Sequence, residues 1–320
     1  MTDTTHATGT PEQEALASHE GSQLLGAADI RLLAQEAGVS PTKKLGQNFV
    51  IDPGTVRRIV RAANLGPQAQ VIEVGPGLGS LTLGLLEAGA SVSAVEIDPR
   101  LAAFLPSTVD SYMPQAADRL EVLGQDALTV TPRSSAKLAA ASELTLVSNL
   151  PYNVATPIIL TLLERFTTLN SFLVMVQKEV ADRLVARPGS KIYGVPSAKL
   201  AWYGRASLAG NIGRNVFWPA PNVDSALVSF TRQADGQLTQ GAQREQVFRL
   251  IDAAFAQRRK TLRAALHGVV DDEAFAQAGI DSKRRGETLT IQEFARLAEC
   301  SESPAQAKVG SSQVLKGVEL

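Results

Sequence analysis

Short apolar runs alternate with helix-length segments through the middle of this chain of 320 residues. The runs that predict buried strands are QVIEV from residue 70, SVSAVEID from 91, LEVLGQD from 120, LTLVSNL from 144 and SFLVMVQ from 171. Buried strands separated by helices are typical of a parallel, doubly wound α/β sheet. Two further β-rich runs, SAKLAWYGRASL (197–208) and VDSALVSFTR (223–232), predict an antiparallel pair at the edge of that sheet.

Helical spacing of apolar residues marks both ends of the chain. It predicts a helix over 27–37 and a second over 53–64. After a polar stretch at 232–241, the spacing returns from 247 to 266, and TIQE at 290–293 forms a capping box before a last helix. These patterns predict an acidic, partly disordered extension (1–40), an α/β catalytic domain (41–237), a small helical domain (238–300) and a loose tail (301–320).

Charge is distributed unevenly along the chain. There are 31 Lys and Arg against 32 Asp and Glu, and residues 1–40 hold six of the acids with a single Arg, which leaves the rest at +4. A weakly basic body is compatible with a polyanionic partner without requiring one. Cys300 is the one cysteine and the three histidines are scattered, so the sequence predicts no disulfide and no metal site.

Membrane and export signals are missing from the pattern. No apolar run reaches the ~20 residues that span a bilayer. The first residues lack the basic start and the apolar stretch of a secretory signal. We therefore expect a cytoplasmic protein that makes no membrane contact.

A glycine-rich loop joins the first predicted strand to the helix after it. Glycines there let a ligand approach the backbone at the carboxyl edge of the sheet, although a glycine turn alone is also common in ordinary tight turns. Gly75, Gly77 and Gly79 are followed by Ser80, where a dinucleotide-binding loop usually has its last glycine. Pro76 also lacks an amide that a pyrophosphate would use. The loop favours a ligand other than NAD.

Two acidic residues follow the next two strands. Glu96 ends the second strand, where a carboxylate can accept both hydroxyl protons of a ribose. Asp126 ends the third strand and can accept from the amine of an adenine. The alternative for Glu96 is an exposed strand-end carboxylate, and Asp126 alone would more often be a turn residue or helix cap. Together with the glycine loop they favour a nucleoside, and the missing phosphate site suits S-adenosylmethionine, which has an amino-acid tail instead.

The fourth strand ends in an amide, a proline and an aromatic residue. The Asn149 side-chain carbonyl can accept one hydrogen of an aromatic amine, and the Leu150 backbone carbonyl can accept the other. Pro151 stiffens the turn, and Tyr152 can stack on an extruded base. The alternative is an ordinary strand exit. Beside the nucleoside signals, we favour a site that orients a target amine toward a methyl donor.

These features occur with further motifs in an order that closely resembles the ribosomal RNA adenine dimethyltransferases. The motifs are LGQNF (45–49), EVGPGLGSLT (73–82), VEID (95–98), GQD (124–126), NLPYN (149–153), QKEVADRL (177–184) and FWPAPNVDSA (217–226). The resemblance extends from about residue 42 to residue 299. It is strongest to the bacterial small-subunit branch of the family, whose loss gives kasugamycin resistance.

The resemblance implies a class I S-adenosylmethionine-dependent methyltransferase fold. That fold is Rossmann-like, with a mostly parallel seven-stranded sheet and a small, all-helical C-terminal domain. It also implies N6,N6-dimethylation of two adjacent adenines in the 3′-terminal hairpin of small-subunit ribosomal RNA, coupled to small-subunit biogenesis. The expected partner is that RNA or an immature small subunit, and the expected oligomeric state is a monomer.

The family motifs also carry residue assignments. They imply cofactor contacts from Asn48, Val50, Gly75, Glu96, Asp126 and Asn149. Val50 stands where the family often has leucine, which changes little if the contact is made through the backbone. The acidic extension before residue 42 lies outside the family pattern.

RNA contacts are expected from one aromatic residue and one basic run. Phe217 is a second candidate for base stacking, and it is as readily an aromatic packed under the edge strands. QRRKTLR at 257–263 contains Arg258, Arg259, Lys260 and Arg263, with Arg259 and Arg263 on one helix face. Such a run is usually a solvated helix face. Its place in a helical domain beside a base-methylating site favours phosphate contacts.

Two other functions stay open on the sequence. A large-subunit rRNA adenine N6-methyltransferase of the macrolide-resistance type shares the glycine loop and an Asn-x-Pro-Tyr motif. The stretch at 217–225 and the basic run favour the small-subunit interpretation. A non-catalytic RNA-binding assembly factor is the other alternative, against which the intact NLPY motif argues.

Overall fold

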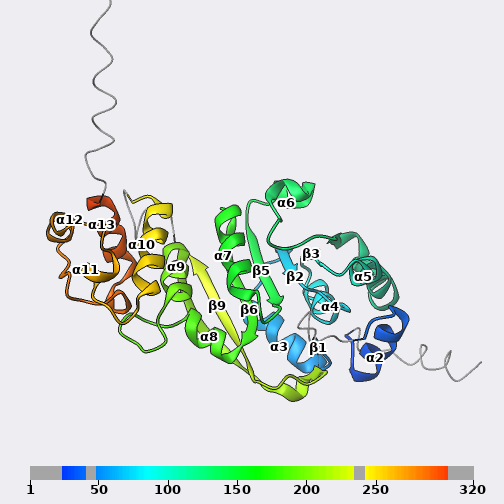
Figure 1. Cartoon of the computed structure of the whole chain (residues 1–320). Helices are drawn as coiled ribbons and strands as arrows, with labels where there is room; N and C mark the ends of the chain where they lie inside the picture. The colour runs from blue at the N-terminus through cyan, green and yellow to red at the C-terminus, as the bar shows by residue number, and fades with distance from the viewer. Residues whose placement is uncertain (1–23, 41–47, 234–241, 302–320) are drawn as a thin grey trace, which may run out of the picture.

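The computed structural model describes residues 24–40, 48–233 and 242–301, and it is built around one large sheet (Figure 1). The strands lie in the order β4-β3-β2-β5-β6-β9-β7, and the neighbouring pairs from β4 to β6 are parallel. The predicted mostly parallel, seven-stranded sheet is therefore confirmed. The strands are β2 (Gln70–Val74), β3 (Ser91–Val95), β4 (Leu120–Leu123), β5 (Leu144–Asn149), β6 (Leu169–Gln177), β7 (Gly204–Ile212) and β9 (Ser225–Arg232).

Alternate residues of the central strands fill two cores, one on each face of the sheet. Val71 and Val147 belong to the first core, and Ile72 and Leu146 belong to the second. Burial on both faces explains why these strands are continuous apolar runs in the sequence. The first face is covered by α2 (Ala27–Glu36), α3 (Pro53–Ala63), α4 (Ser80–Glu87) and α5 (Pro99–Tyr112). The second is covered by α6 (Ala136–Ala140), α7 (Ala155–Arg165), α8 (Lys178–Leu184) and α9 (Val195–Tyr203).

The predicted antiparallel edge pair is confirmed in part. β9 runs antiparallel to both β6 and β7. Residues 197–203, expected as the start of the β7 strand, instead belong to α9, so that part of the prediction is wrong. Pro196 in the first turn favours a helix start. Trp202 and Tyr203 pack edge-on against Phe248 of a C-terminal helix, which gives these aromatic residues burial away from the sheet.

The segment before residue 40 is part of the catalytic domain. α2 confirms the predicted first helix, and its Ile30 and Leu33 are buried in the first core. The Tyr112 hydroxyl of α5 donates a hydrogen bond to Asp29 at 3.2 Å. The predicted boundary at residue 40 made residues 24–40 part of a separate extension. The structure instead packs them into the catalytic domain. The rest of that extension, 1–23, lies outside the described residues.

The C-terminal helices pack on the end of the sheet near α9 (Figure 1). Thr290 and Glu293 form the predicted capping box at the start of the last helix. Tyr193 and Ala198 of the preceding domain share one core with these helices. The predicted boundary at 237–238 and the tail from 302 lie outside the described residues. The helices are α10 (Arg244–Ala256), α11 (Leu262–Ala265), α12 (Asp272–Gln277) and α13 (Ile291–Cys300).

The remaining elements are short. Two-residue strands β1 (Phe49–Val50) and β8 (Phe217–Trp218) pair antiparallel beside the main sheet. In the described ranges, no helix is long and apolar enough to cross a membrane. The 3₁₀ turns are Pro114–Arg119, Pro132–Ser134, Arg214–Val216 and Gly286–Thr288.

Candidate active site

The site lies where β2 and β5 separate. β2 pairs with β3 from Gln70 to Val74 but pairs with β5 over two residues only. Beyond them the Ser148 hydroxyl accepts the Val74 N–H at 2.6 Å and donates to the Val74 carbonyl at 2.8 Å. A buried side chain thus replaces the ladder where the strand order reverses. In doubly wound sheets, ligands bind in the crevice at this point.

A pocket of about 990 Å³, counted to its open mouth, occupies this crevice. The lining includes every residue that the sequence assigned to the cofactor or the target amine, while their roles stay predictions. These residues are Asn48, Val50, Gly75, Glu96, Asp126, Asn149, Leu150 and Tyr152.

The glycine loop has the backbone conformation that requires glycine. Gly75 and Gly77 have φ angles of +68° and +59°, in the left-handed region. A Cβ atom on Gly77 would lie 2.9 Å from the ring of Phe49, so a side chain here would displace β1. The Gly75 N–H donates to the Val95 carbonyl at 2.9 Å, which ties the loop to β3. The loop therefore brings bare backbone to the pocket wall.

Glu96 is buried at the end of β3, with 5% of its surface exposed. Its Oε2 accepts the Gly77 N–H at 3.2 Å, and its Oε1 accepts the Asp98 N–H at 3.0 Å. Burial raises the pKa of the Glu96 carboxyl, and these two backbone donors oppose that shift. A carboxylate can accept about four hydrogen bonds, so acceptor capacity remains for a ligand hydroxyl.

Hydrogen bonds hold Asp126 after β4 and Val50 in β1. Asp126 Oδ1 accepts the Leu128 N–H at 2.9 Å, which confirms a turn at the end of β4. Its Oδ2 has no partner in the described part of the chain and remains an acceptor at the pocket. The Val50 carbonyl accepts the Ser80 hydroxyl at 2.7 Å, and the Val50 side chain is buried. Ser80, which departs from the dinucleotide loop pattern, thus anchors β1.

Asn149 is held by its amide nitrogen. Its Nδ2 donates to the Asn48 carbonyl at 3.1 Å, which leaves Oδ1 without a partner among the described residues. The Leu150 N–H donates to the Met175 carbonyl at 3.0 Å, so β6 fixes the next residue as well. The arrangement provides a fixed amide oxygen at the pocket, as an amine-orienting group needs.

Tyr152 lines the pocket with a half-buried ring. Its hydroxyl lies 2.8 Å from the Ser225 hydroxyl on β9, and burial raises the pKa of the phenol. From the sequence, a role was expected only for the ring face of Tyr152, and Ser225 was not among the predicted residues. That contact crosses 73 positions and is not signalled by either residue alone.

Glu73 is a pocket residue that the sequence analysis did not assign. It lies on β2, is 1% exposed and accepts the Thr82 hydroxyl of α4 at 2.7 Å. Burial raises the pKa of Glu73 to about 8, with the charge of Glu96 adding to the shift. The signal in the sequence was a carboxylate inside the apolar run QVIEV, because ionisable side chains in buried strands are rarely incidental.

Two expectations about the RNA contacts need correction, the exposure of Phe217 and the shared helix face of Arg259 and Arg263. Phe217 is 3% exposed and packs in the first core, so it is a structural aromatic residue and is not available for stacking. Arg258 and Arg263 form ion pairs with Glu287 and Asp272. α10 ends at Ala256 and α11 starts at Leu262, so Arg259 and Arg263 do not share a helix face.

The chemistry of the lining fits S-adenosylmethionine. No Lys, Arg or His lines the described wall of the pocket, so nothing there would neutralise a phosphate. Glu96 and Asp126 offer acceptors for ribose hydroxyls and an adenine amine, and Ile97 and Leu101 supply apolar surface. The sheet order and this pocket define a class I S-adenosylmethionine-dependent methyltransferase.

Comparison with known proteins narrows the class. The family model described as ribosomal RNA adenine dimethylase matches residues 39–302. A relative from Bifidobacterium longum (strain DJO10A), named ribosomal RNA small subunit methyltransferase A, is 67% identical over 88% of this chain and 94% of its own. A relative of the same name from Streptomyces griseus is 57% identical over 89% and 97%. The chain belongs to the ribosomal RNA adenine dimethylase family.

Solved structures agree with the fold. A 23S rRNA methyltransferase, ErmE, shares 26% identity with a TM-score of 0.60, covering 80% of this chain and 100% of ErmE. A dimethyladenosine transferase from Plasmodium falciparum shares 22% identity with a TM-score of 0.63, covering 78% and 95%. The second likeness concerns the fold alone.

Proposed function

We propose that this protein transfers methyl groups from S-adenosylmethionine to N6 of two adjacent adenines in the 3′-terminal hairpin of small-subunit ribosomal RNA. The observation that carries the proposal is the single pocket that joins Glu96 and Asp126 to the Asn149-Leu150-Pro151-Tyr152 turn. Nucleoside acceptors thus lie beside a group suited to orient an aromatic amine. The relatives' shared name, small subunit methyltransferase A, supports the choice of RNA.

The chain's own residues would hold the methyl donor from three strand ends. Glu96 would accept from both ribose hydroxyls, Asp126 from the adenine amine, and the Gly75 backbone would lie against the amino-acid tail. Asn48 and Val50 would close the site from β1. When bound, S-adenosylmethionine supplies a methyl group that its sulfonium already activates, so no acid or base is needed for the transfer itself.

The target amine would be held by two oxygens. N6 of adenine is a poor nucleophile because its lone pair is delocalised into the ring. The Asn149 Oδ1 and the Leu150 carbonyl would each accept one hydrogen and so favour a pyramidal nitrogen. Tyr152, fixed by Ser225, would stack on the extruded base. Catalysis would then arise from position and electrostatics.

Phosphate contacts would come from the unpaired cations of the basic run. Arg259 and Lys260 are exposed and form no ion pair within the described residues. We therefore retain these two and drop Arg258 and Arg263 from the set, since both already have carboxylate partners. An immature small subunit is the proposed partner, and the protein would act as a monomer in the cytoplasm.

A substrate-preference assay tests the proposal against its two alternatives. Unmethylated small subunits, large subunits and naked RNA are each incubated with labelled S-adenosylmethionine. We expect label in small-subunit RNA. Label in large-subunit RNA alone would support the macrolide-resistance type, and tight RNA binding without label would support the non-catalytic assembly factor.

A further inference from the structure

Arg258 lies at the seam between the two domains, where loop 187–193 of the catalytic domain contacts the C-terminal domain. Its Nη2 donates to the Lys191 carbonyl at 2.6 Å, and its Nε donates to Glu287 Oε2 at 2.8 Å. Lys191 belongs to the loop 187–193 of the catalytic domain, whereas Glu287 belongs to the turn before α13. One guanidinium group therefore bridges both domains. Its side chain is 37% exposed and that of Glu287 is 27% exposed, so the pair is partly shielded from water.

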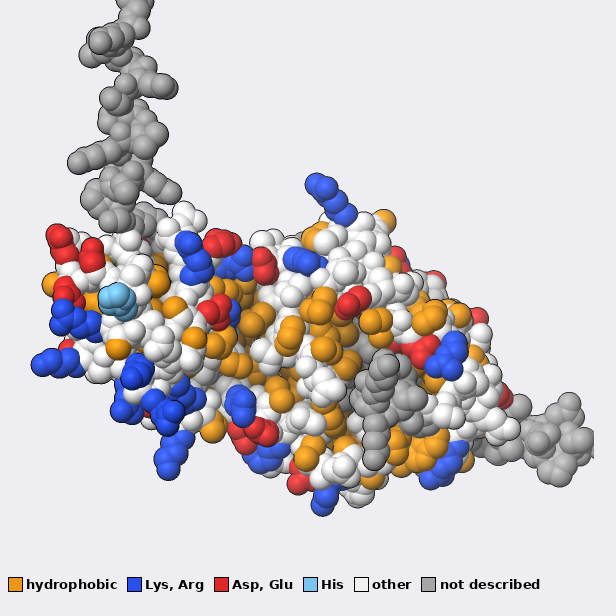
Figure 2. Space-filling model, in the orientation of Figure 1, with side chains coloured by type: hydrophobic (Ala, Val, Ile, Leu, Met, Phe, Trp, Pro, Cys, Tyr) orange, Lys and Arg blue, Asp and Glu red, His pale blue; other side chains and the backbone are white. Residues whose placement is uncertain are grey.

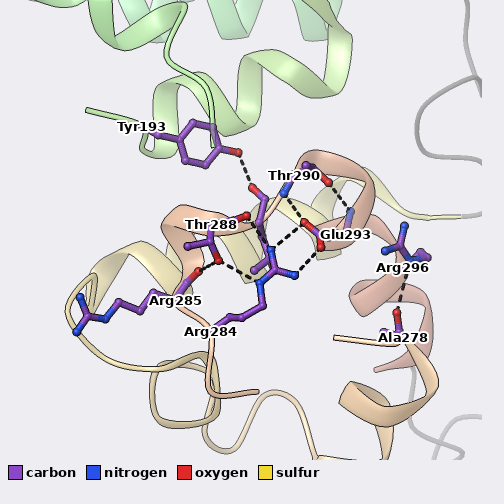
Figure 3. Close-up of polar contacts among 9 residues, drawn as sticks. Tyr193, Ala278, Arg284, Arg285, Thr288, Thr290, Glu293 and Arg296 are labelled. Carbon is purple, nitrogen blue, oxygen red and sulfur yellow. Dashed lines mark hydrogen bonds and ion pairs between the residues drawn. The ribbon is translucent and has the colours of Figure 1, made fainter. Parts of the chain in front are cut away.

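Two further hydrogen bonds join the same segments. The Gly189 N–H donates to the Glu287 carbonyl at 2.7 Å. The buried Tyr193 hydroxyl donates to the Leu289 carbonyl at 3.0 Å, and Figure 3 shows its ring reaching across to the turn before α13. Loop 187–193 is thus tied to the C-terminal domain at three successive points.

The cations around this seam are of two kinds. Arg284 lies between Glu293 and Thr288, as Figure 3 shows, and Arg258 and Arg263 are paired as well. A second set is exposed and has no ion pair within the described ranges: Arg187, Lys191, Arg259, Lys260, Lys283 and Arg285. Figure 2 shows blue side chains gathered along the lower edge of the molecule below the C-terminal helices. The unpaired set includes residues from both domains, so the seam determines how its members are arranged.

The seam connects to the pocket through the sheet. Loop 187–193 follows α8, which begins directly after β6. β6 pairs with β5 up to Asn149 and Met175, and the Met175 carbonyl accepts the Leu150 N–H. A displacement of the C-terminal domain at the seam would therefore change the distance and angle between bound RNA and the amine-orienting turn.

We propose that Arg258 is a positioning residue that fixes the C-terminal domain, and the RNA bound to it, relative to the methyl-transfer pocket. The inference rests on the proposed function. Arg258 acts through its planar fork, which reaches a carbonyl and a carboxylate from two different nitrogens. A lysine keeps the charge but has one nitrogen at the end of a flexible stem, so it does not reproduce this bridge.

The effect of Glu287→Gln on the methylation rate distinguishes two possible roles of Arg258. If Arg258 served mainly as a phosphate contact, Glu287→Gln would free its charge and remove a nearby negative charge, so RNA binding and methylation would both stay equal or improve. If Arg258 instead fixes the position of the C-terminal domain, Glu287→Gln removes the carboxylate with which Arg258 pairs. RNA binding then stays equal or improves while methylation slows. A faster or unchanged methylation rate in Glu287→Gln would overturn the positioning role of Arg258.

The experiment uses the full chain with Arg258→Lys, Glu287→Gln, the double variant, and Arg263→Lys as control. Arg263 pairs with Asp272, and both residues belong to the C-terminal domain. The readouts are single-turnover methylation of unmethylated small subunits at saturating cofactor and subunits, subunit affinity across salt concentrations, and cofactor affinity. We expect about a 10-fold or larger rate loss in each single seam variant, since misplacement by ~1 Å is sufficient for that loss. The double variant should be no slower than the slower single variant.

The control should stay within about 2-fold of wild type, and cofactor affinity and the salt slope should be unchanged in all variants. Additive rate losses, or a wild-type rate in Arg258→Lys, would contradict the inference. Amide exchange provides a readout that does not depend on methylation: both seam variants should exchange faster over 187–193, and the control should not. Unchanged amide exchange over 187–193 in the seam variants would also overturn the positioning role of Arg258. A wild-type protein that methylates no small subunits would instead refute the proposed function.

Discussion

Replacing Glu96 with alanine should weaken the binding of S-adenosylmethionine in a predictable amount. The substitution removes a buried carboxylate whose two oxygens each accept one backbone N–H, from Gly77 at 3.2 Å and Asp98 at 3.0 Å. It also removes both proposed ribose acceptors. A hydrogen bond to a charged group contributes about 1.5–3 kcal/mol. Partial replacement by water in the cavity reduces the total for two such bonds to about 2–4 kcal/mol.

That free energy corresponds to a Kd increase of about 30- to 1,000-fold. Isothermal titration calorimetry on the free enzyme measures it directly. Glu121→Ala is a matched control, because Glu121 lies on β4, bonds to Ser93 and does not line the pocket. Thermal unfolding of both variants separates loss of binding from loss of fold. A folded Glu96→Ala protein with wild-type affinity would refute the ribose assignment.

The raised pKa of Glu96 adds a pH dependence with a defined sign. A carboxyl with a raised pKa takes up its proton at a higher pH than an ordinary glutamate, and protonation removes acceptor capacity. Wild-type cofactor affinity should therefore fall as the pH is lowered through this pKa. The Glu96→Ala variant should lack this component.

Substitutions at Asn149, at Glu73 and at the Arg259–Lys260 pair give three further predictions. Asn149→Ala should lower single-turnover methylation by about 10²-fold with RNA affinity unchanged, and a wild-type rate would make NLPY an ordinary strand exit. Burial raises the pKa of Glu73 to about 8, so the folded protein keeps the Glu73 proton at a pH where the unfolded chain has lost it. As the pH rises from about 5 to 8, the cofactor-free wild type should therefore lose about 1.4 kcal/mol of unfolding free energy per pH unit relative to Glu73→Gln. Parallel curves of stability against pH for the two proteins would contradict this. The double variant Arg259→Ala, Lys260→Ala should flatten the salt dependence of RNA binding by about one unit of slope per residue, and Arg263→Gln should not change it. A wild-type slope in the double variant would show that Arg259 and Lys260 form a solvated surface that does not contact RNA.

The sequence predicted the pocket well because parallel strands impose their own geometry. Glu96, Asp126 and Asn149 each follow an apolar run, and the carboxyl ends of parallel strands meet at one edge. The left-handed φ angles at Gly75 and Gly77 follow from the same loop. Once the strands are identified by their patterns, these residues must converge.

The errors arose where partners are distant in the sequence. Glu287 lies 29 positions from Arg258, so a charge run could not reveal that this cation is already paired. Phe217 is equally apolar whether it stacks on a base or fills a core, and only its neighbours decide. α9 was mistaken for a strand because Trp202 and Tyr203 favour strands locally, whereas packing against Phe248 determines the helix.

Mass-spectrometric mapping of the modified bases tests the central claim most directly. Small subunits that lack adenine dimethylation are incubated with the purified protein and isotopically labelled S-adenosylmethionine, and fragments of their RNA are sequenced. We expect four labelled methyl groups per RNA, as two adjacent N6,N6-dimethyladenines in the 3′-terminal hairpin, and about 10²-fold slower labelling with Asn149→Ala. Unlabelled small-subunit RNA, or label at any other position, would contradict it.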